Sequence, residues 1–185
     1  MAESYPPVAG GQRITGALLR SMLPLTARKT SDTPRSATTT TVADPHLQFE
    51  LEANAVYTLT GWLKYDGPTA GDINIDWTAP AGCLGEYTAW GSGNASITAT
   101  VGVTLTSDTQ SVRGYMIRTE TNDISQSRSF GCLGLALTPL TIQIWGTVRN
   151  GPTAGTYSLD WAQLTSDASP TTLYTDSWLE LRRTA

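Results

Sequence analysis

The chain has 185 residues and a mass of 19.8 kDa, which suits one compact domain, or a smaller domain with an appendage, better than two full domains. Its formal net charge at pH 7 is -4. The acidic balance excludes general nucleic-acid binding, which needs a basic face, and no run approaches the ~20 apolar residues of a membrane span. Hydrophobic residues make up 39% and charged residues only 15%, so the chain can bury a core beneath a hydroxyl-rich surface.

The N-terminal region lacks the basic start and apolar centre of a secretory signal peptide, so we expect a protein made in the cytoplasm of a bacterial host.

Residues 12–23 place apolar side chains three and four positions apart, which predicts a short amphipathic helix that Pro24 would end. Its candidate attachment residues are Ile14, Leu18, Leu19 and Met22, flanked by Arg13 and Arg20. A helix this short is marginal alone, so the stripe must pack on the body, a sister subunit or a partner.

Charge and periodicity both change near residue 45. Residues 1–45 carry five basic and three acidic residues, a net charge of +2, whereas the remainder carries seven and thirteen, a net charge of -6. Residues 29–42 have no apolar periodicity, and their run of four threonines favours extended backbone. The sequence therefore predicts an N-terminal attachment arm over 1–45 and a β knob over 46–185.

From residue 46 onward, apolar and polar residues alternate with the period of two that is typical of strands. About nine runs show this pattern: residues 47–52, 57–65, 73–77, 97–105, 112–119, 133–137, 140–148, 157–161 and 173–181. Many short strands separated by turn residues, with almost no helical pattern, predict an all-β, jelly-roll-like β-sandwich.

Two segments repeat a turn sequence. Residues 66–71 are DGPTAG and residues 150–155 are NGPTAG, and each leads into a strand that ends in Asp-Trp. Such segments cannot continue a strand, so we expect turns in two pseudo-equivalent hairpins.

Cys83 and Cys132 also share a Gly-Cys-Leu-Gly string, which suggests equivalent positions and direct contact. The cytoplasmic origin favours free thiols over a disulfide.

The chain offers little for catalysis. Its single histidine, His46, excludes a catalytic triad and a histidine-rich metal site, and we expect it to be structural or solvated. Carboxylates gather around the repeated turns, where a pair would suit glycoside hydrolysis: Asp72, Asp76, Asp160 and Glu86. Because the aspartates alternate with core residues, a solvated face is the favoured interpretation. We expect no enzymatic activity, no cofactor and no metal.

The six tryptophans divide by their place in the alternation. Trp77 and Trp161 alternate with polar residues on apolar faces, which predicts core positions. Trp62, Trp90 and Trp145 fall on polar faces instead, so they are candidates for a subunit contact or for stacking on a glycan. Of the two, we favour the subunit contact.

Five strings extend over nearly the whole chain: AGGQRITGALL at 9–19, ARKTSDT at 27–33, TTTTVADPHL at 38–47, EANAVY at 52–57 and DSWL at 176–179. In this order they resemble small virion proteins of tailed phages of actinobacteria, of the head-fibre, capsid-decoration or minor-tail type. The resemblance implies a trimeric, jelly-roll-like β knob with an N-terminal attachment segment. It implies no active-site residues.

These observations together predict a non-enzymatic structural protein of a phage virion, a homotrimeric capsid-decoration or head-fibre protein that docks on capsid or tail proteins through its arm. We expect no nucleic-acid or membrane partner. Two alternatives stay open: a tail-fibre or minor tail protein that binds a host-surface glycan, and a monomeric lectin-like module. A solution mass of about three times 19.8 kDa favours the trimer.

Overall fold

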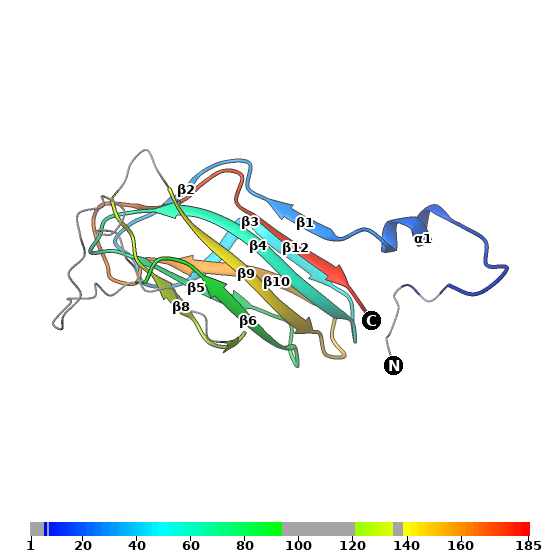
Figure 1. Cartoon of the computed structure of the whole chain (residues 1–185). Helices are drawn as coiled ribbons and strands as arrows, with labels where there is room; N and C mark the ends of the chain where they lie inside the picture. The colour runs from blue at the N-terminus through cyan, green and yellow to red at the C-terminus, as the bar shows by residue number, and fades with distance from the viewer. Residues whose placement is uncertain (1–5, 7, 94–120, 135–138) are drawn as a thin grey trace, which may run out of the picture.

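The computed structural model describes residues 6, 8–93, 121–134 and 139–185. Two antiparallel β-sheets pack face to face, and the single helix of the described residues, α1 (Gly16–Ser21), lies beyond one end of them (Figure 1). The prediction of an all-β sandwich is confirmed. The finer comparison with a jelly roll stays a prediction.

The larger sheet, sheet A, has the strand order β1-β12-β4-β9-β6-β7, with β11 paired to β4 and β2 paired to β11. Its strands are β1 (Leu25–Arg28), β2 (Thr33–Arg35), β4 (Val56–Asp66), β6 (Leu84–Trp90), β7 (Asn122–Asp123), β9 (Leu140–Arg149), β11 (Thr171–Leu173) and β12 (Trp178–Arg183). The smaller sheet, sheet B, has the order β3-β10-β5-β8. Its strands are β3 (Val42–Leu51), β5 (Ile73–Thr78), β8 (Arg128–Phe130) and β10 (Gly155–Ala162).

The two repeated segments turn the chain at equivalent places, as predicted, but each turn carries the chain from sheet A to sheet B. The prediction that they close hairpins is therefore wrong. One joins β4 to β5 and the other joins β9 to β10, while β4 pairs with β9 and β5 pairs with β10. The first residue of each turn is buried, but one side chain accepts a hydrogen bond and the other donates one. Asp66 Oδ1 accepts from the Leu133 backbone N–H at 2.9 Å, whereas Asn150 Nδ2 donates to the Glu52 carbonyl at 2.9 Å.

The hydrophobic core fills the space between the sheets with the inward side chains of the long strands. Trp161 is fully buried, and Trp77 stacks on Tyr157 with ring centroids 5.1 Å apart, so the prediction that both tryptophans are core residues is confirmed. Fully burying one large apolar side chain stabilises the fold by roughly 1.5–3 kcal/mol.

Residues 25–45 belong to the sandwich, which corrects the prediction of an arm over residues 1–45. β1 pairs with β12 at the edge of sheet A, and β2 pairs with β11. β3 begins at Val42, so the boundary expected at residue 45 falls inside a strand. The part of the described chain that leaves the sandwich at this end is the stretch before β1 (Figure 1).

A buried ion pair ties this region to the core. Lys29 Nζ lies 2.6 Å from Asp44 Oδ2, and both side chains are fully buried. The same ammonium donates to Thr33 Oγ1 at 2.7 Å, and Trp161 Nε1 donates to Asp44 Oδ2 at 3.2 Å. Burial lowers the pKa of Lys29, and its hydrogen bond to Asp44 opposes that effect. Charged anchors of this kind give a sequence no apolar periodicity, which explains why residues 29–42 resembled an arm.

Five predicted runs match β3, β4, β5, β9 and β10. The run over 173–181 is divided into β11 and β12 by a turn in which Asp176 has φ of 69°. The runs over 97–105 and 112–119 lie outside the described residues, as does most of 133–137. β6 was not predicted because its inward positions include Gly85, where a Cβ would lie 2.6 Å from the Thr147 carbonyl oxygen.

Candidate functional site

The first candidate surface is the N-terminal segment, residues 8–24. Its helix begins after Thr15, whose Oγ1 accepts from the Leu18 backbone N–H at 3.2 Å, an N-cap contact. α1 therefore covers Gly16–Ser21, which is shorter than the predicted 12–23. The segment lies away from both sheets, beyond the start of β1 (Figure 1).

The apolar stripe of this segment faces solvent. No residue of α1 is buried, and Ile14 and Leu19 keep 73% and 53% of their surface exposed. Met22 is also exposed, Leu18 is half-buried, and Arg13 and Arg20 lie exposed beside the stripe. Leu23 was missed as an attachment candidate, although its position before Pro24 in an apolar run was a signal. An exposed apolar cluster of this kind usually marks an interaction surface.

A hollow of about 330 Å³ separates α1 from the end of the sandwich. Arg20 lines it from the helix, and Tyr57 and Leu181 line it from β4 and β12. Arg183, also at this wall, forms an ion pair with Glu52. The helix therefore lies beyond the end of the sandwich and adds no residue to the hydrophobic core.

The second candidate surface, the tryptophan face, consists of the outward side chains of β12, β4, β9 and β6. The strand register places four residues in one row across sheet A: Trp178, Trp62, Gln143 and Trp90. The next row holds Glu180, Thr60, Trp145 and Thr88. The structure thus brings the three predicted residues Trp62, Trp90 and Trp145 together on one polar face. Trp178 was missed, although its alternation with Leu179 placed it on that face.

The indole rings on this face are partly open to solvent. Trp90 and Trp145 make an edge-to-face contact with centroids 5.1 Å apart and planes at 66°, yet they stay 45% and 39% exposed. Lys64 Nζ lies 5.8 Å from the centroid of the Trp62 ring. These contacts leave the other faces of the rings open to a ligand.

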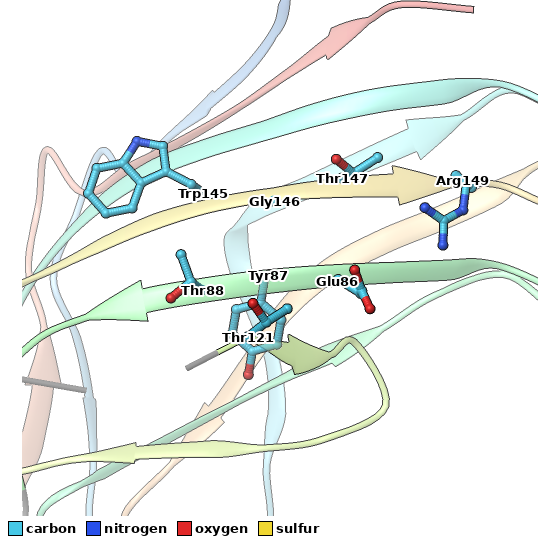
Figure 2. Close-up of a pocket in the computed structure, with 8 residues that line it drawn as sticks. All are labelled: Glu86, Tyr87, Thr88, Thr121, Trp145, Gly146, Thr147 and Arg149. Atoms are coloured by element: carbon cyan, nitrogen blue, oxygen red, sulfur yellow. The ribbon is translucent and has the colours of Figure 1, made fainter. Parts of the chain in front are cut away.

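Two shallow hollows flank Trp145. One, of about 380 Å³, is lined by Thr60, Trp62, Gln143, Trp145 and Trp178. The other, of about 390 Å³, lies beside Thr88, Thr147, Glu86 and Arg149. Figure 2 shows Trp145 at one end of this second hollow and the Glu86 and Arg149 side chains at the other. One hollow is therefore aromatic and the other is polar.

The four carboxylates are divided between sheet B, the turn before β5 and the outward face of sheet A. Asp76 lies opposite Asp160 on sheet B, where Thr78 Oγ1 donates to Asp160 Oδ2 at 2.8 Å. Glu86 lies on the outward face of the other sheet. Asp72 precedes β5, and its Oδ1 accepts from the Cys132 backbone N–H at 2.9 Å. Burial raises the pKa of Asp72, and the same hydrogen bond opposes the effect.

Cys83 and Cys132 are both free and lie at opposite ends of β5, so the predicted contact between them is wrong. Burial raises the pKa of the Cys132 thiol.

His46 is half-buried, with Nδ1 3.7 Å from Asp44 Oδ1. Within the described ranges, no three His, Cys, Asp or Glu side chains gather in a way that would hold a metal ion. No helix there has the length and hydropathy of a membrane span.

Comparisons with protein-family models, with curated proteins and with solved structures found no match for this chain. The functional interpretation rests instead on two surfaces of the described residues. They are the N-terminal segment, with its exposed apolar stripe, and the tryptophan face of sheet A.

Proposed function

We propose that the protein is a non-enzymatic structural protein of a virion that docks through its N-terminal segment and presents the β-sandwich as a knob. The observation that carries this proposal is the apolar stripe of residues 8–24, which the described part of the chain leaves uncovered. Burial of this stripe on a particle surface would remove Ile14, Leu19 and Met22 from water. Exposed apolar side chains do not stabilise a free monomer, so their exposure points to a binding partner.

The expected energetics favour apolar docking over charge pairing. Each large side chain contributes roughly 1.5–3 kcal/mol when fully buried, before ordering costs are subtracted. Arg13 and Arg20 would add about 0–1 kcal/mol each through exposed ion pairs. The apolar residues therefore dominate, and the arginines orient the segment on an acidic surface.

A homotrimer, as a capsid-decoration or head-fibre protein, fits a short anchor. One such segment binds weakly because ordering it costs conformational entropy. Three copies on one trimer bind together, and the second and third contacts become intramolecular, which raises the overall affinity. The docking surface is then a capsid or tail protein. Sedimentation of the purified chain at micromolar concentration is expected to give about three times 19.8 kDa.

The decisive experiment compares two double variants that remove the same number of exposed apolar side chains. Ile14→Asp with Leu19→Asp places charges on the stripe, and Leu84→Asp with Leu164→Asp places them on the body at exposed leucines. The stripe variant is expected to be lost from gradient-purified particles, detected by immunoblot, because charged groups oppose burial. The body variant is expected to be incorporated.

Thermal unfolding of both double variants provides the control. Neither pair is buried, so each midpoint is expected to stay close to that of the parent chain. Normal incorporation of the stripe variant would refute the docking role. A marked loss of its thermal midpoint would show instead that the segment stabilises its own body.

A further inference from the structure

The tryptophan face combines indole rings with hydroxyl, amide and charged groups, and it holds no aliphatic groups in its two central rows. The register places polar residues between and beside the rings: Thr60, Thr88, Gln143 and Glu180. Leu, Ile, Val, Met and Phe are absent from the two rows that run across β12, β4, β9 and β6. A cluster of partly exposed tryptophans marks an interaction surface, and the polar groups beside them decide which ligand it suits.

This chemistry suits a saccharide better than a second protein chain. The centre of a protein interface is depleted in charged residues and enriched in apolar area, whereas this face has Glu180 in its second row. A pyranose ring has a C–H face that stacks on an indole and a rim of hydroxyls that both donate and accept hydrogen bonds. Thr60 and Gln143 provide matching donors and acceptors beside the rings.

The tryptophan face extends across several strands, which gives room for more than one sugar ring. Trp62 and Trp90 lie in one row on strands two apart, which separates their backbones by about 10 Å. Trp145 stands between the aromatic hollow of about 380 Å³ and the polar hollow of about 390 Å³. Two neighbouring hollows with a shared tryptophan provide room for successive rings of a linear saccharide.

The charges of the polar hollow favour a neutral ligand. Glu86 and Arg149 lie at the same end of it, so their opposite charges offset one another (Figure 2). Thr88, Thr121 and Thr147 add hydroxyl groups to its lining. Neither a carboxylated nor an amino sugar would gain a net electrostatic attraction from this arrangement.

We propose that the tryptophan face binds a neutral polysaccharide. One pyranose ring stacks in the hollow between Trp62, Trp145 and Trp178, and the next is held by hydroxyl contacts from Thr88 and Thr147. This binding site goes beyond the proposed docking function and uses no residue of the N-terminal segment. A chain that fails to dock on particles is therefore expected to keep its saccharide affinity.

Affinity electrophoresis of the full chain tests the proposal. Native gels containing a soluble glucan, mannan, galactan, arabinan or xylan serve as probes, and alginate serves as an acidic comparison. At least one neutral polysaccharide is expected to retard the protein. Trp62→Ala and Trp145→Ala are each expected to weaken binding about tenfold, as for the loss of one central aromatic contact.

Three further variants sharpen the result. Trp145→Tyr is expected to retain most of the affinity because it keeps an aromatic face. Leu164→Ala, which removes an exposed apolar side chain away from this face, is expected to bind like the parent chain. Ile14→Asp with Leu19→Asp is also expected to bind normally, which separates this site from docking.

Several outcomes would overturn the proposal. These are retardation by none of the neutral probes, retardation by alginate alone, and equal retardation of the parent and the two tryptophan-to-alanine variants. Sedimentation provides a separate readout on the same proteins. If Trp62→Ala and Trp145→Ala convert an oligomer into a monomer and no neutral probe binds, a second copy of the chain occupies the face instead.

Discussion

Asp44→Ala is expected to lower the free energy of unfolding by about 3–5 kcal/mol, because it leaves the buried Lys29 ammonium without its partner. The same change removes the acceptor of the Trp161 indole N–H, which donates to Asp44 at 3.2 Å. Asp44→Asn is expected to cost less, since an amide oxygen can still accept from Trp161. Chemical denaturation of the purified chain measures each difference.

The matched control for this prediction is Arg28, which directly precedes Lys29 in the chain. Its ion pair with Asp176 is more than half exposed on both sides, so Arg28→Ala is expected to cost only about 0–1 kcal/mol. Comparable losses for Arg28→Ala and Asp44→Ala would mean that the buried pair does not hold residues 25–45 to the core. The contrast between an exposed and a buried ion pair thus tests the corrected boundary directly.

Two truncations are expected to differ completely in their ability to fold. Removal of residues 1–45 deletes β1, β2, Lys29 and Asp44, and it exposes the edge of β12 to solvent. That truncated chain is expected to lose its cooperative thermal transition. Removal of residues 1–23 deletes α1, which has no buried residue, and leaves every strand in place, so the remaining chain is expected to unfold cooperatively near the parent midpoint.

Circular dichroism at rising temperature distinguishes the two truncations, and sedimentation reports whether the shorter deletion keeps its oligomeric state. A cooperative transition for the chain lacking residues 1–45 would show that the sandwich begins at residue 46 after all. A loss of folding on removal of residues 1–23 would show that α1 stabilises the body. Either result would move the boundary again.

Alternation predicted the long strands because each has one buried and one solvated face. In β4, for example, Leu59 and Leu63 point inward while Thr60 and Trp62 point outward. The alternation did not predict β1 and β2, because both strands are short and because the buried or half-buried side chains that fix them, Lys29 and Arg35, are charged. Their pairing partners β12 and β11 lie far away along the chain, so no local pattern identifies them.

The tryptophan face was partly predictable for the same reason. Alternation placed Trp62 and Trp145 on polar faces, but it could not show that these faces belong to one sheet. Only the register joins Trp178 to Trp62 and sets Trp90 two strands away in the same row. The repeated turns illustrate the same limit: their sequences predicted a change of direction, and the change of sheet depends on pairing between distant strands.

The pairing of β1 with β12 also defines how the protein would carry mechanical load. Tension on the N-terminal segment enters the sandwich at Leu25 and runs along β1, which extends in line with the strands of sheet A (Figure 1). The antiparallel ladder from Leu25 to Arg28 is then pulled in shear, so its hydrogen bonds share the force instead of opening one at a time. Immediately behind it, the Lys29–Asp44 pair ties the tether to the opposite sheet.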